Sequence, residues 1–285
     1  MTRVCSAFLK YLLCAALCLL LITSCWAEAA DALGSSESLL RGCDVYGNTN
    51  TETSFGSVAA DAARESCGAD IALLPSEDFG NNIQPGAVTE EDLAFCLLND
   101  SPLAVTELTA GRIWEMLEIS FSHLQLKDGM IDRENSYFAG YLQTSGLRVR
   151  CDAAAPAGSR VLKVTLTDGT VLDPEDESTT YRVVSTRQLL LGAYGYPAVT
   201  EQALEDAGTE REVVANYFRA QETVSEPESG RIRIDGTRDW LRDNLLKVLL
   251  IVVALLFMLG RLSKSKRRED VWRSSRTATA DEVEQ

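Results

Sequence analysis

The chain has a single histidine, His123, among its 285 residues. Histidine is the commonest metal ligand and the usual general base near neutral pH. One histidine cannot supply the ligands of a dinuclear metal centre, and any histidine-based triad would have to be built on it. Ser145-Gly146 does not form a GxSxG nucleophile elbow. We therefore predict no catalytic residue, no metal ligand and no cofactor in this chain.

Eight cysteines fall into two groups of four. The first group lies in the apolar N-terminal segment: Cys5, Cys14, Cys18 and Cys25. The second lies in the middle of the chain: Cys43, Cys67, Cys96 and Cys151. Four cysteines allow three pairings, and this wide spacing matches no zinc-binding pattern. Because Cys67 and Cys96 lie in apolar helical patterns, disulfides and buried free thiols both stay open.

The N-terminal residues 1–29 have the pattern of a secretory signal peptide. Arg3 and Lys10 precede an apolar run, residues 11–22, that ends in small residues. One expectation is cleavage at a small-x-small site, either residues 25–27 or residues 27–29. Residues 22–25 (ITSC) also resemble a bacterial lipobox, so lipidation at Cys25 is an alternative, and an uncleaved anchor is a third. Residues 30–49 are predicted to form a leader or stalk.

Residues 244–262 predict a transmembrane helix. They include 12 uninterrupted apolar residues, Val248 to Leu259, and approach the length needed to cross about 30 Å of hydrocarbon. Five basic residues lie directly after these: Arg261, Lys264, Lys266, Arg267 and Arg268. By the positive-inside rule they are cytoplasmic. We expect a single-pass protein of the cell membrane, with its N-terminal domain outside and residues 263–285 as a polar cytoplasmic tail.

The external part of the chain is strongly acidic. Residues 30–243 contain 36 Asp and Glu and 17 Lys and Arg, which gives a formal charge of −19. Such a charge repels a nucleic-acid backbone and excludes it as a partner. A nucleotide ligand would need a local basic or amide-lined pocket to offset this repulsion.

Helical and strand patterns alternate irregularly through residues 50–236. The helices expected from periodicity and capping lie at Phe55–Glu65, after Thr89, after Thr109 and at Thr209–Thr223. The expected strands are Ala69–Leu74, Leu103–Leu108, Leu147–Cys151, Val161–Leu166, Tyr181–Ser185 and Arg231–Ile234. Without a strict strand–helix–strand rhythm, they indicate an α/β class with a mixed α+β sheet, folded as one domain.

Seven short segments add a family resemblance to this pattern. They are residues 52–64 (ETSFGSVAADAAR), 68–74 (GADIALL), 105–118 (VTELTAGRIWEMLE), 141–149 (YLQTSGLRV), 172–174 (LDP), 192–196 (GAYGY) and 230–232 (GRI). In order and spacing they resemble the C-terminal, substrate-binding domain of the 5'-nucleotidase family. In that family a separate N-terminal metallophosphatase domain binds two metals and performs hydrolysis. The resemblance covers only the C-terminal domain, and the single histidine argues against a metallophosphatase domain.

The residues that contact substrate in the family are changed here. The family places an Asn- and Gly-rich loop ending in Arg after the GADIALL strand, and its Asn and Arg contact substrate. This chain has Pro75 and Gly80 at those positions, with Glu77 and Asp78 between them. Two acids repel a phosphate group. The resemblance therefore implies a shared scaffold without the family's substrate-binding residues.

The resemblance also locates a degenerate ligand cleft. The two aromatic residues that sandwich the nucleobase in the family align with Leu103 and Gln188, and the aspartate of its GGDGY motif aligns with Tyr194. The expected cleft residues are Phe79, Leu103, Gln188, Tyr194 and Tyr196. Tyrosine rings there would still be able to stack on a planar ligand.

Two functional hypotheses follow. In the first, the protein is a non-catalytic pseudoenzyme that uses the domain to bind a ligand or a protein. In the second, it is the substrate-binding component of a nucleotide-hydrolysing, nucleotide catabolic system and presents a nucleotide or nucleoside to a separate metallophosphatase subunit. An independent hydrolase is a third hypothesis, which the missing substrate and metal residues disfavour.

Overall fold

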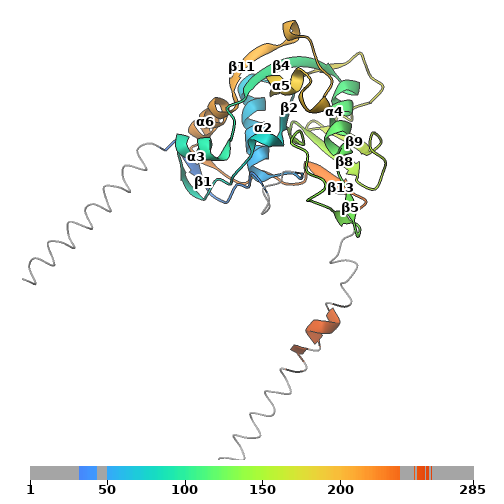
Figure 1. The fold of residues 1–285 in the computed structure, drawn as a ribbon. Coiled ribbons are helices and arrows are strands. Elements are labelled where there is room, and N and C mark those ends of the chain that lie inside the picture. Colours follow the sequence, from blue (N-terminus) through green and yellow to red (C-terminus); the bar gives the residue numbers. More distant parts are fainter. Residues whose placement is uncertain are drawn as a thin grey trace, which may run out of the picture. The chain divides into compact units, whose positions relative to one another are not determined.

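The computed structural model describes residues 32–43 and 50–237, together with residues 247, 249–253, 255, 256 and 258 (Figure 1). The chain divides into two compact units, residues 1–237 and 238–285. The predicted signal (1–29) and tail (263–285) lie outside the described residues, and the predicted span (244–262) lies partly outside them. Among the residues that are described, no helix has the length and apolar character required to cross a membrane.

A five-stranded mixed sheet forms the centre of the first unit, in the order β11-β4-β10-β2-β7. Its strands are β2 (Ile71–Pro75), β4 (Pro102–Thr109), β7 (Leu142–Ser145), β10 (Thr180–Thr186) and β11 (Glu205–Thr209). β2 and β10 are parallel, and the other neighbours are antiparallel. The predicted mixed sheet is therefore confirmed.

Both faces of this sheet are buried, which explains why β2 is apolar throughout. Ala72 and Leu74 point into one hydrophobic cluster, whereas Ile71 and Leu73 point into a second cluster on the opposite face. Successive side chains of a strand alternate between faces. A continuous apolar run is thus the pattern required of a central strand covered on both sides.

Three helices contribute to the first cluster: α2 (Ser54–Cys67), α3 (Glu90–Cys96) and α6 (Glu210–Gln221). Thr53 caps α2 by accepting a hydrogen bond from the backbone N–H of Gly56, and Gly68 ends the helix in the left-handed conformation. The face of α2 that lies on the sheet is mostly alanine, so the helix packs closely against β2 and β7.

Helix α4 (Ala110–Ser122) and a three-stranded sheet cover the opposite face (Figure 1). The sheet has the order β13-β8-β9, with β8 (Leu147–Asp152), β9 (Val161–Leu166) and β13 (Ile232–Asp235). Gly146 joins β7 to β8 at φ +83°, and a Cβ there would lie 2.0 Å from the carbonyl oxygen of Asp70. Only glycine fits between β7 and β8, because any side chain would collide with the Asp70 carbonyl. This explains the glycine in the Ser-Gly-Leu segment.

A small third sheet corrects the predicted leader. β1 (Gly34–Ser36) pairs with β12 (Thr223–Val224) and β3 (Gly86–Val88), and Leu40 is completely buried. Residues 32–43 therefore belong to the folded domain, because their backbone completes a sheet and their apolar side chains enter the core. The remaining elements are β5 (Leu126–Lys127), β6 (Met130–Ile131), α5 (Arg187–Leu190) and the 3-10 turns η1 (Ser76–Asp78), η2 (Ala193–Gly195) and η3 (Glu201–Ala203).

The predicted start of α3 at Thr89 is confirmed as a capping box. The Thr89 hydroxyl accepts from the N–H of Asp92 at 3.2 Å, and the Asp92 carboxylate accepts from the N–H of Thr89 at 2.8 Å. We expect Thr89→Ala to lower the free energy of unfolding by about 1 kcal/mol. Thr200 precedes η3 but makes no capping side-chain bond, so Thr200→Ala is the matched control in urea denaturation. Equal losses in both variants would contradict the prediction.

Candidate ligand-binding cleft

A cleft of about 310 Å³ lies where the parallel strands β2 and β10 end. Crevices at the carboxyl ends of such strands are the usual ligand sites of open α/β sheets. Ends of strands contribute Pro75, Pro102 and Thr186. The other lining residues come from the turns η1 and η2, the loop before β4 and helix α5: Glu77, Asp78, Tyr194, Asn99, Asp100, Ser101 and Gln188. The substituted loop predicted from the sequence is thus one wall of this cleft.

That loop turns back on itself in the short 3-10 turn η1. The backbone N–H groups of Ser76 and Glu77 donate to the carbonyls of Tyr141 and Ala139, and the N–H of Gly80 donates to Cys96. The Phe79 N–H closes the turn onto the Ser76 carbonyl. These four amides are occupied within the chain, so the loop does not offer them to an anion.

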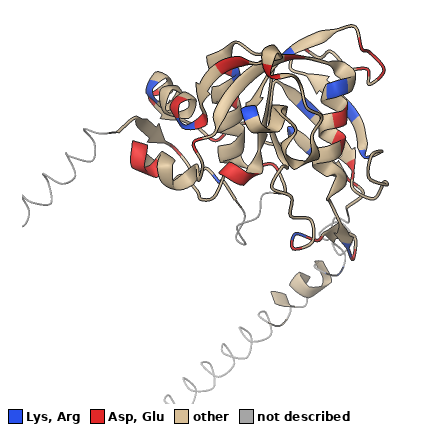
Figure 2. Cartoon of the chain, turned by 45° about the horizontal axis from the view of Figure 1, so that its top comes forward, with Lys and Arg blue, Asp and Glu red and all other residues tan. Residues whose placement is uncertain are grey.

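Acidic side chains define the electrostatics of the cleft. Asp78 is 2% exposed and accepts a hydrogen bond from the side-chain amide of Asn99 at 2.7 Å. Glu77 is exposed and accepts from the Tyr194 hydroxyl. Asp100 lies 3.6 Å from the guanidinium of Arg211. Acidic residues are also spread over the rest of the domain surface (Figure 2), so the cleft lies within a generally negative field.

Behind the cleft lies a buried carboxyl group, that of Glu210 at the start of α6. Its side chain is completely buried and lies beside the carboxyl group of Asp78. Burial raises the pKa of this carboxyl well above its usual range, and the charge of Asp78, a side-chain hydrogen bond with Asp78 and the charge of Asp100 raise it further. These surroundings favour the neutral form of Glu210 in the folded domain.

The five predicted cleft residues divide into two sets. Gln188 and Tyr194 line the cleft. Phe79 and Leu103 are 2% and 1% exposed and lie in the first hydrophobic cluster, where Phe79 packs edge-on against Phe55. Tyr196 is 3% exposed and donates its hydroxyl to the Gly140 carbonyl at 2.7 Å. These three are core side chains: Leu103 is a buried residue of β4, and the turns that carry Phe79 and Tyr196 direct their rings inward.

Asn99, Asp100, Ser101 and Glu210 were missed by sequence reasoning. The first three form a polar run immediately before the apolar strand β4. The change from polar to apolar residues is the one signal in the sequence that marks them. Glu210 carries no such signal, because an acidic residue in the first turn of a helix is ordinary.

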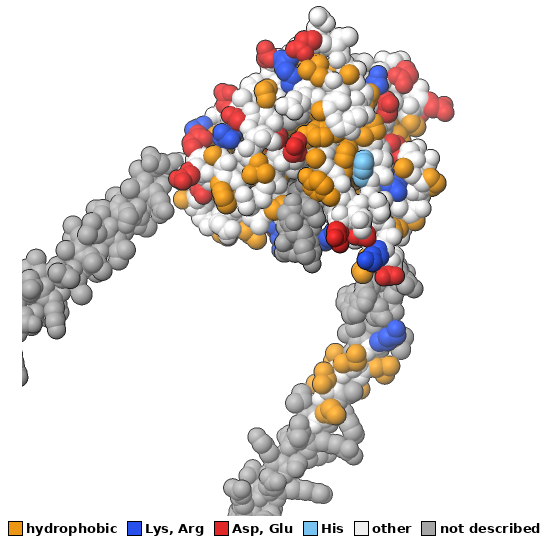
Figure 3. Space-filling model, viewed as in Figure 1, with side chains coloured by type: hydrophobic (Ala, Val, Ile, Leu, Met, Phe, Trp, Pro, Cys, Tyr) orange, Lys and Arg blue, Asp and Glu red, His pale blue; other side chains and the backbone are white. Residues whose placement is uncertain are grey.

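The single histidine is a packing residue at the edge of an aromatic cluster. His123 stacks on Phe138 with ring centroids 4.0 Å apart, and Phe138 in turn contacts Tyr194 and Tyr196 at 6.4 and 6.3 Å. Figure 3 shows hydrophobic side chains gathered on the face that carries the histidine. The cluster fixes the ring of Tyr194, whose backbone has an uncommon φ of +60°.

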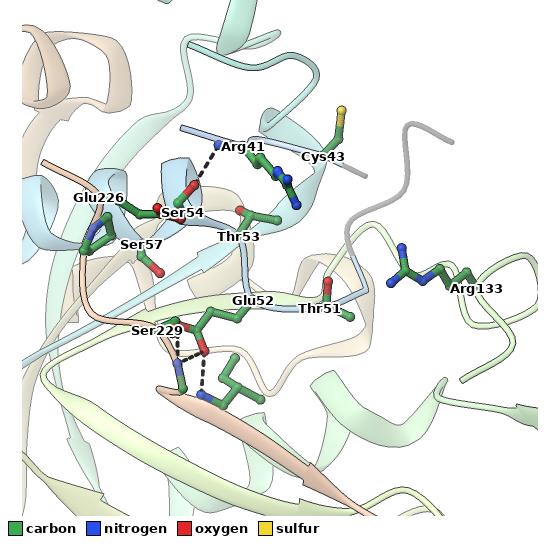
Figure 4. Close-up of a pocket in the computed structure, with 13 residues that line it drawn as sticks. Arg41, Cys43, Thr51, Glu52, Thr53, Ser54, Ser57, Arg133, Glu226 and Ser229 are labelled. Atoms are coloured by element: carbon green, nitrogen blue, oxygen red, sulfur yellow. Dashed lines mark hydrogen bonds between the residues drawn. The ribbon is translucent and has the colours of Figure 1, made fainter. Parts of the chain in front are cut away.

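A second pocket of about 330 Å³ lies beside the start of α2 (Figure 4). Glu52 accepts hydrogen bonds from the backbone N–H groups of Gly230 at 3.1 Å and Ile232 at 2.9 Å. The N–H of Arg41 donates to the Ser54 hydroxyl at 2.7 Å. These bonds attach the segments before α2 to the final strand, so the polar groups of this pocket serve chiefly to join segments.

The thiols and carboxylates do not assemble into a metal centre in the part of the chain that the structure describes. No group of three or more His, Cys, Asp or Glu residues there is arranged to hold a metal ion. Cys67, Cys96 and Cys151 are free thiols. The open choice between disulfides and free thiols is thus decided in favour of thiols for these three.

Burial makes two of these thiols unreactive. It raises the pKa of Cys96 and of Cys151 to about 12 each, and only the thiolate is an effective nucleophile. We expect iodoacetamide at pH 8 to modify neither in the native state and both in urea, as measured by peptide mass spectrometry. Fast native labelling of Cys96 or Cys151 would contradict this expectation.

Comparisons of the sequence with a family profile and with curated proteins agree on one family. The profile of the 5'-nucleotidase C-terminal domain matches residues 30–201. An apyrase of Aedes aegypti is 26% identical over 220 residues, which are 73% of this chain and 37% of the apyrase. An apyrase of Aedes albopictus is 25% identical over 57% of this chain and 28% of its own length.

Solved structures agree with the sequence relatives. The 5'-nucleotidase precursor of Thermus thermophilus aligns with a TM-score of 0.61 and 25% identity, over 76% of this chain and 42% of that one. The NAD nucleotidase of Haemophilus influenzae shares the fold at a TM-score of 0.57 and 13% identity, over 71% and 38%. The chain thus spans less than half the length of these relatives. It belongs to the family of the 5'-nucleotidase C-terminal domain.

Proposed function

We propose that this protein is a membrane-anchored surface protein whose nucleotidase-like domain binds a ligand or a protein partner and does not itself hydrolyse nucleotides. The observation that supports this most directly is the wall of the cleft. Glu77 and Asp78 occupy the substituted loop, and four backbone amides of that loop donate to carbonyls of the chain. A phosphate group needs donors or cations, and this wall offers acceptors.

A second candidate is the substrate-binding component of a nucleotide-hydrolysing system with a separate metallophosphatase partner. It is favoured by the relatives, which carry the names apyrase and 5'-nucleotidase and are more than twice as long as the matched region. On that hypothesis the cleft binds a nucleotide or nucleoside through residues other than those of the family.

The membrane anchor in this proposal rests on the sequence. Residues 244–262 supply the apolar length and the basic residues after them supply the orientation. Protease treatment of intact cells is the direct test. We expect it to remove the domain and to leave a protected C-terminal fragment, whereas full protection of the domain would contradict surface exposure.

The functional test uses the full chain in mild detergent. AMP, ADP and ATP are incubated with it in the presence of Mn²⁺ while phosphate release is followed, and AMP and adenosine are titrated calorimetrically. We expect neither hydrolysis nor micromolar nucleotide binding. Hydrolysis would overturn the proposal, and nucleotide binding without hydrolysis would favour the second candidate.

A further inference from the structure

The pocket of about 330 Å³ beside the start of α2 has donor groups that its joining hydrogen bonds leave unused (Figure 4). Helix α2 has 14 residues, and its first turn carries the positive end of the helix dipole. Two amides of that turn are already bound, since the N–H of Gly56 donates to the Thr53 hydroxyl and the N–H of Phe55 donates to the carbonyl of Arg41. The end of the helix does not define a ligand site by itself.

The hydroxyl of Ser57 is the group that points to a ligand. Ser57 lines the pocket from the first turn of α2 and is only 2% exposed, and its Oγ has no hydrogen-bond partner among the residues that the structure describes. Figure 4 shows this oxygen directed toward the space that the lining residues enclose. A buried polar group without a partner is costly and uncommon in native structures. A molecule bound in the pocket would supply the missing hydrogen bond.

The other unused groups on this side of the pocket are donors. Arg41 is exposed, and its guanidinium forms no ion pair within the described part of the chain. Ser54 accepts a hydrogen bond from the N–H of Arg41, which leaves its own hydroxyl proton for another acceptor. The carboxylate of Glu52 is occupied, because it accepts from the N–H groups of Gly230 and Ile232. A guanidinium and two hydroxyls beside a helix N-terminus suit an oxyanion.

The surrounding charge favours an oxyanion with a single charge. Glu226 also lines the pocket and is exposed, and residues 30–243 carry a formal charge of −19. Both repel a doubly charged phosphate more strongly than a carboxylate. The planar guanidinium of Arg41 matches the two oxygens of a carboxylate. A volume of about 330 Å³ lies in the range for small-molecule sites, so the carboxylate is one end of a larger ligand.

We propose that this pocket binds the carboxylate end of a small ligand, with Arg41 as its charge partner and the hydroxyls of Ser54 and Ser57 as further donors. This inference rests on the proposed function, since it gives the ligand-binding domain a site and a ligand class. The carboxylate can belong to a small organic acid or to the C-terminus of a peptide, and the probes below distinguish these two sources.

The test is a calorimetric titration of the full chain in mild detergent at low salt, with propionate and with N-acetylalanine. We expect saturable binding, which Arg41→Gln weakens about tenfold because it removes a charged donor. Glu226→Gln removes the opposing acid and is expected to strengthen binding about threefold. Arg219 lies on α6, outside the pocket, and is ion-paired with Glu90, so Arg219→Gln is the matched control for charge. The probe that binds more tightly identifies the source of the carboxylate.

Ser57→Ala separates ligand binding from folding. The variant removes a hydroxyl that has no partner in the free protein, so we expect an unchanged or higher melting temperature. It also removes a donor to the ligand, so we expect carboxylate binding to weaken about fivefold. A purely structural Ser57 would give the opposite pair of results, a lower melting temperature and an unchanged affinity, and this would overturn the proposal.

Three further results would also overturn the carboxylate site. They are no binding of either probe to the folded chain, equal weakening by Arg219→Gln, and equal binding of the uncharged N-acetylalaninamide. Inorganic phosphate that binds more tightly than both carboxylates, and is lost with Arg41→Gln, would overturn the choice of a singly charged ligand. None of these results bears on hydrolysis, so the non-catalytic proposal would stand. Hydrolysis of AMP would overturn the proposed function itself.

Discussion

Replacing Asp61 by alanine is expected to lower the free energy of unfolding by about 3 kcal/mol, because it leaves a largely buried guanidinium without its counter-ion. Arg231 donates two hydrogen bonds to the Asp61 carboxylate, at 2.8 and 2.7 Å, and the two side chains are only 16% and 18% exposed. The Ser145 hydroxyl donates to the same carboxylate at 2.5 Å. One residue thus joins α2, β7 and the approach to β13.

Urea denaturation followed by circular dichroism measures this loss. Glu228→Ala is the matched control, because it removes the carboxylate from an ion pair with Arg148 in which both side chains are more than half exposed. Such surface pairs contribute about 0–1 kcal/mol. If Asp61→Ala and Glu228→Ala lowered the free energy of unfolding equally, the Asp61–Arg231 pair would not stabilise the contact between α2, β7 and the approach to β13.

Replacing Glu210 by glutamine is expected to abolish a fall in stability between pH 5 and pH 8. The pKa of Glu210 is raised in the folded state, so the folded domain binds more protons than the unfolded chain in this range. The contribution of Glu210 to the free energy of unfolding is therefore fully present below its pKa in the unfolded chain, about 4.3. That contribution is lost as the pH rises through the pKa of Glu210 in the folded domain. The slope is at most about 1.4 kcal/mol per pH unit.

The groups that act on Glu210 are Asp78, through its charge and a side-chain hydrogen bond, and Asp100, through its charge. Asp100 is itself paired with Arg211. Asp132, Asp168, Asp176 and Asp235 have lowered pKa values, so they affect stability at acidic pH and with the opposite sign. Melting temperatures across pH 5–8 give the slope. Glu212→Gln, on the same helix and exposed, is expected to keep it; a parent protein with a flat profile would contradict the prediction.

The central elements were predictable because local patterns and tertiary environment agree there. The apolar run of β2, the Thr caps of α3 and α4 and the alternation in β13 all correspond to elements of the structure. The predicted leader was wrong in its folded part, since Gly34–Ser36 is a strand only through its pairing with β3 and β12. A three-residue strand of glycine and serine has no pattern of its own.

The sequence indicated where the cleft lies, but it did not indicate which residues line it. The substituted loop identified the correct wall, because a buried strand that ends in polar residues marks an edge of the sheet. Phe79 and Tyr196 were expected to face the ligand but enter the core, since the residue type does not say which way a loop turns its rings. Glu210 lies beside Asp78 and Asp100 through packing of α6 against loops distant in sequence, and no local pattern encodes that approach.

The pairing of β1 with β12 and of β8 with β13 has a consequence for biosynthesis. Ser35 and Thr223 are 188 residues apart yet lie side by side, so neither small sheet can be completed until the last residues of the domain have left the ribosome. Contacts of such long range slow folding. A nascent chain stopped at residue 201, where the family match ends, would lack the partners of β1, β4 and β8. The three unfinished strand edges would promote aggregation.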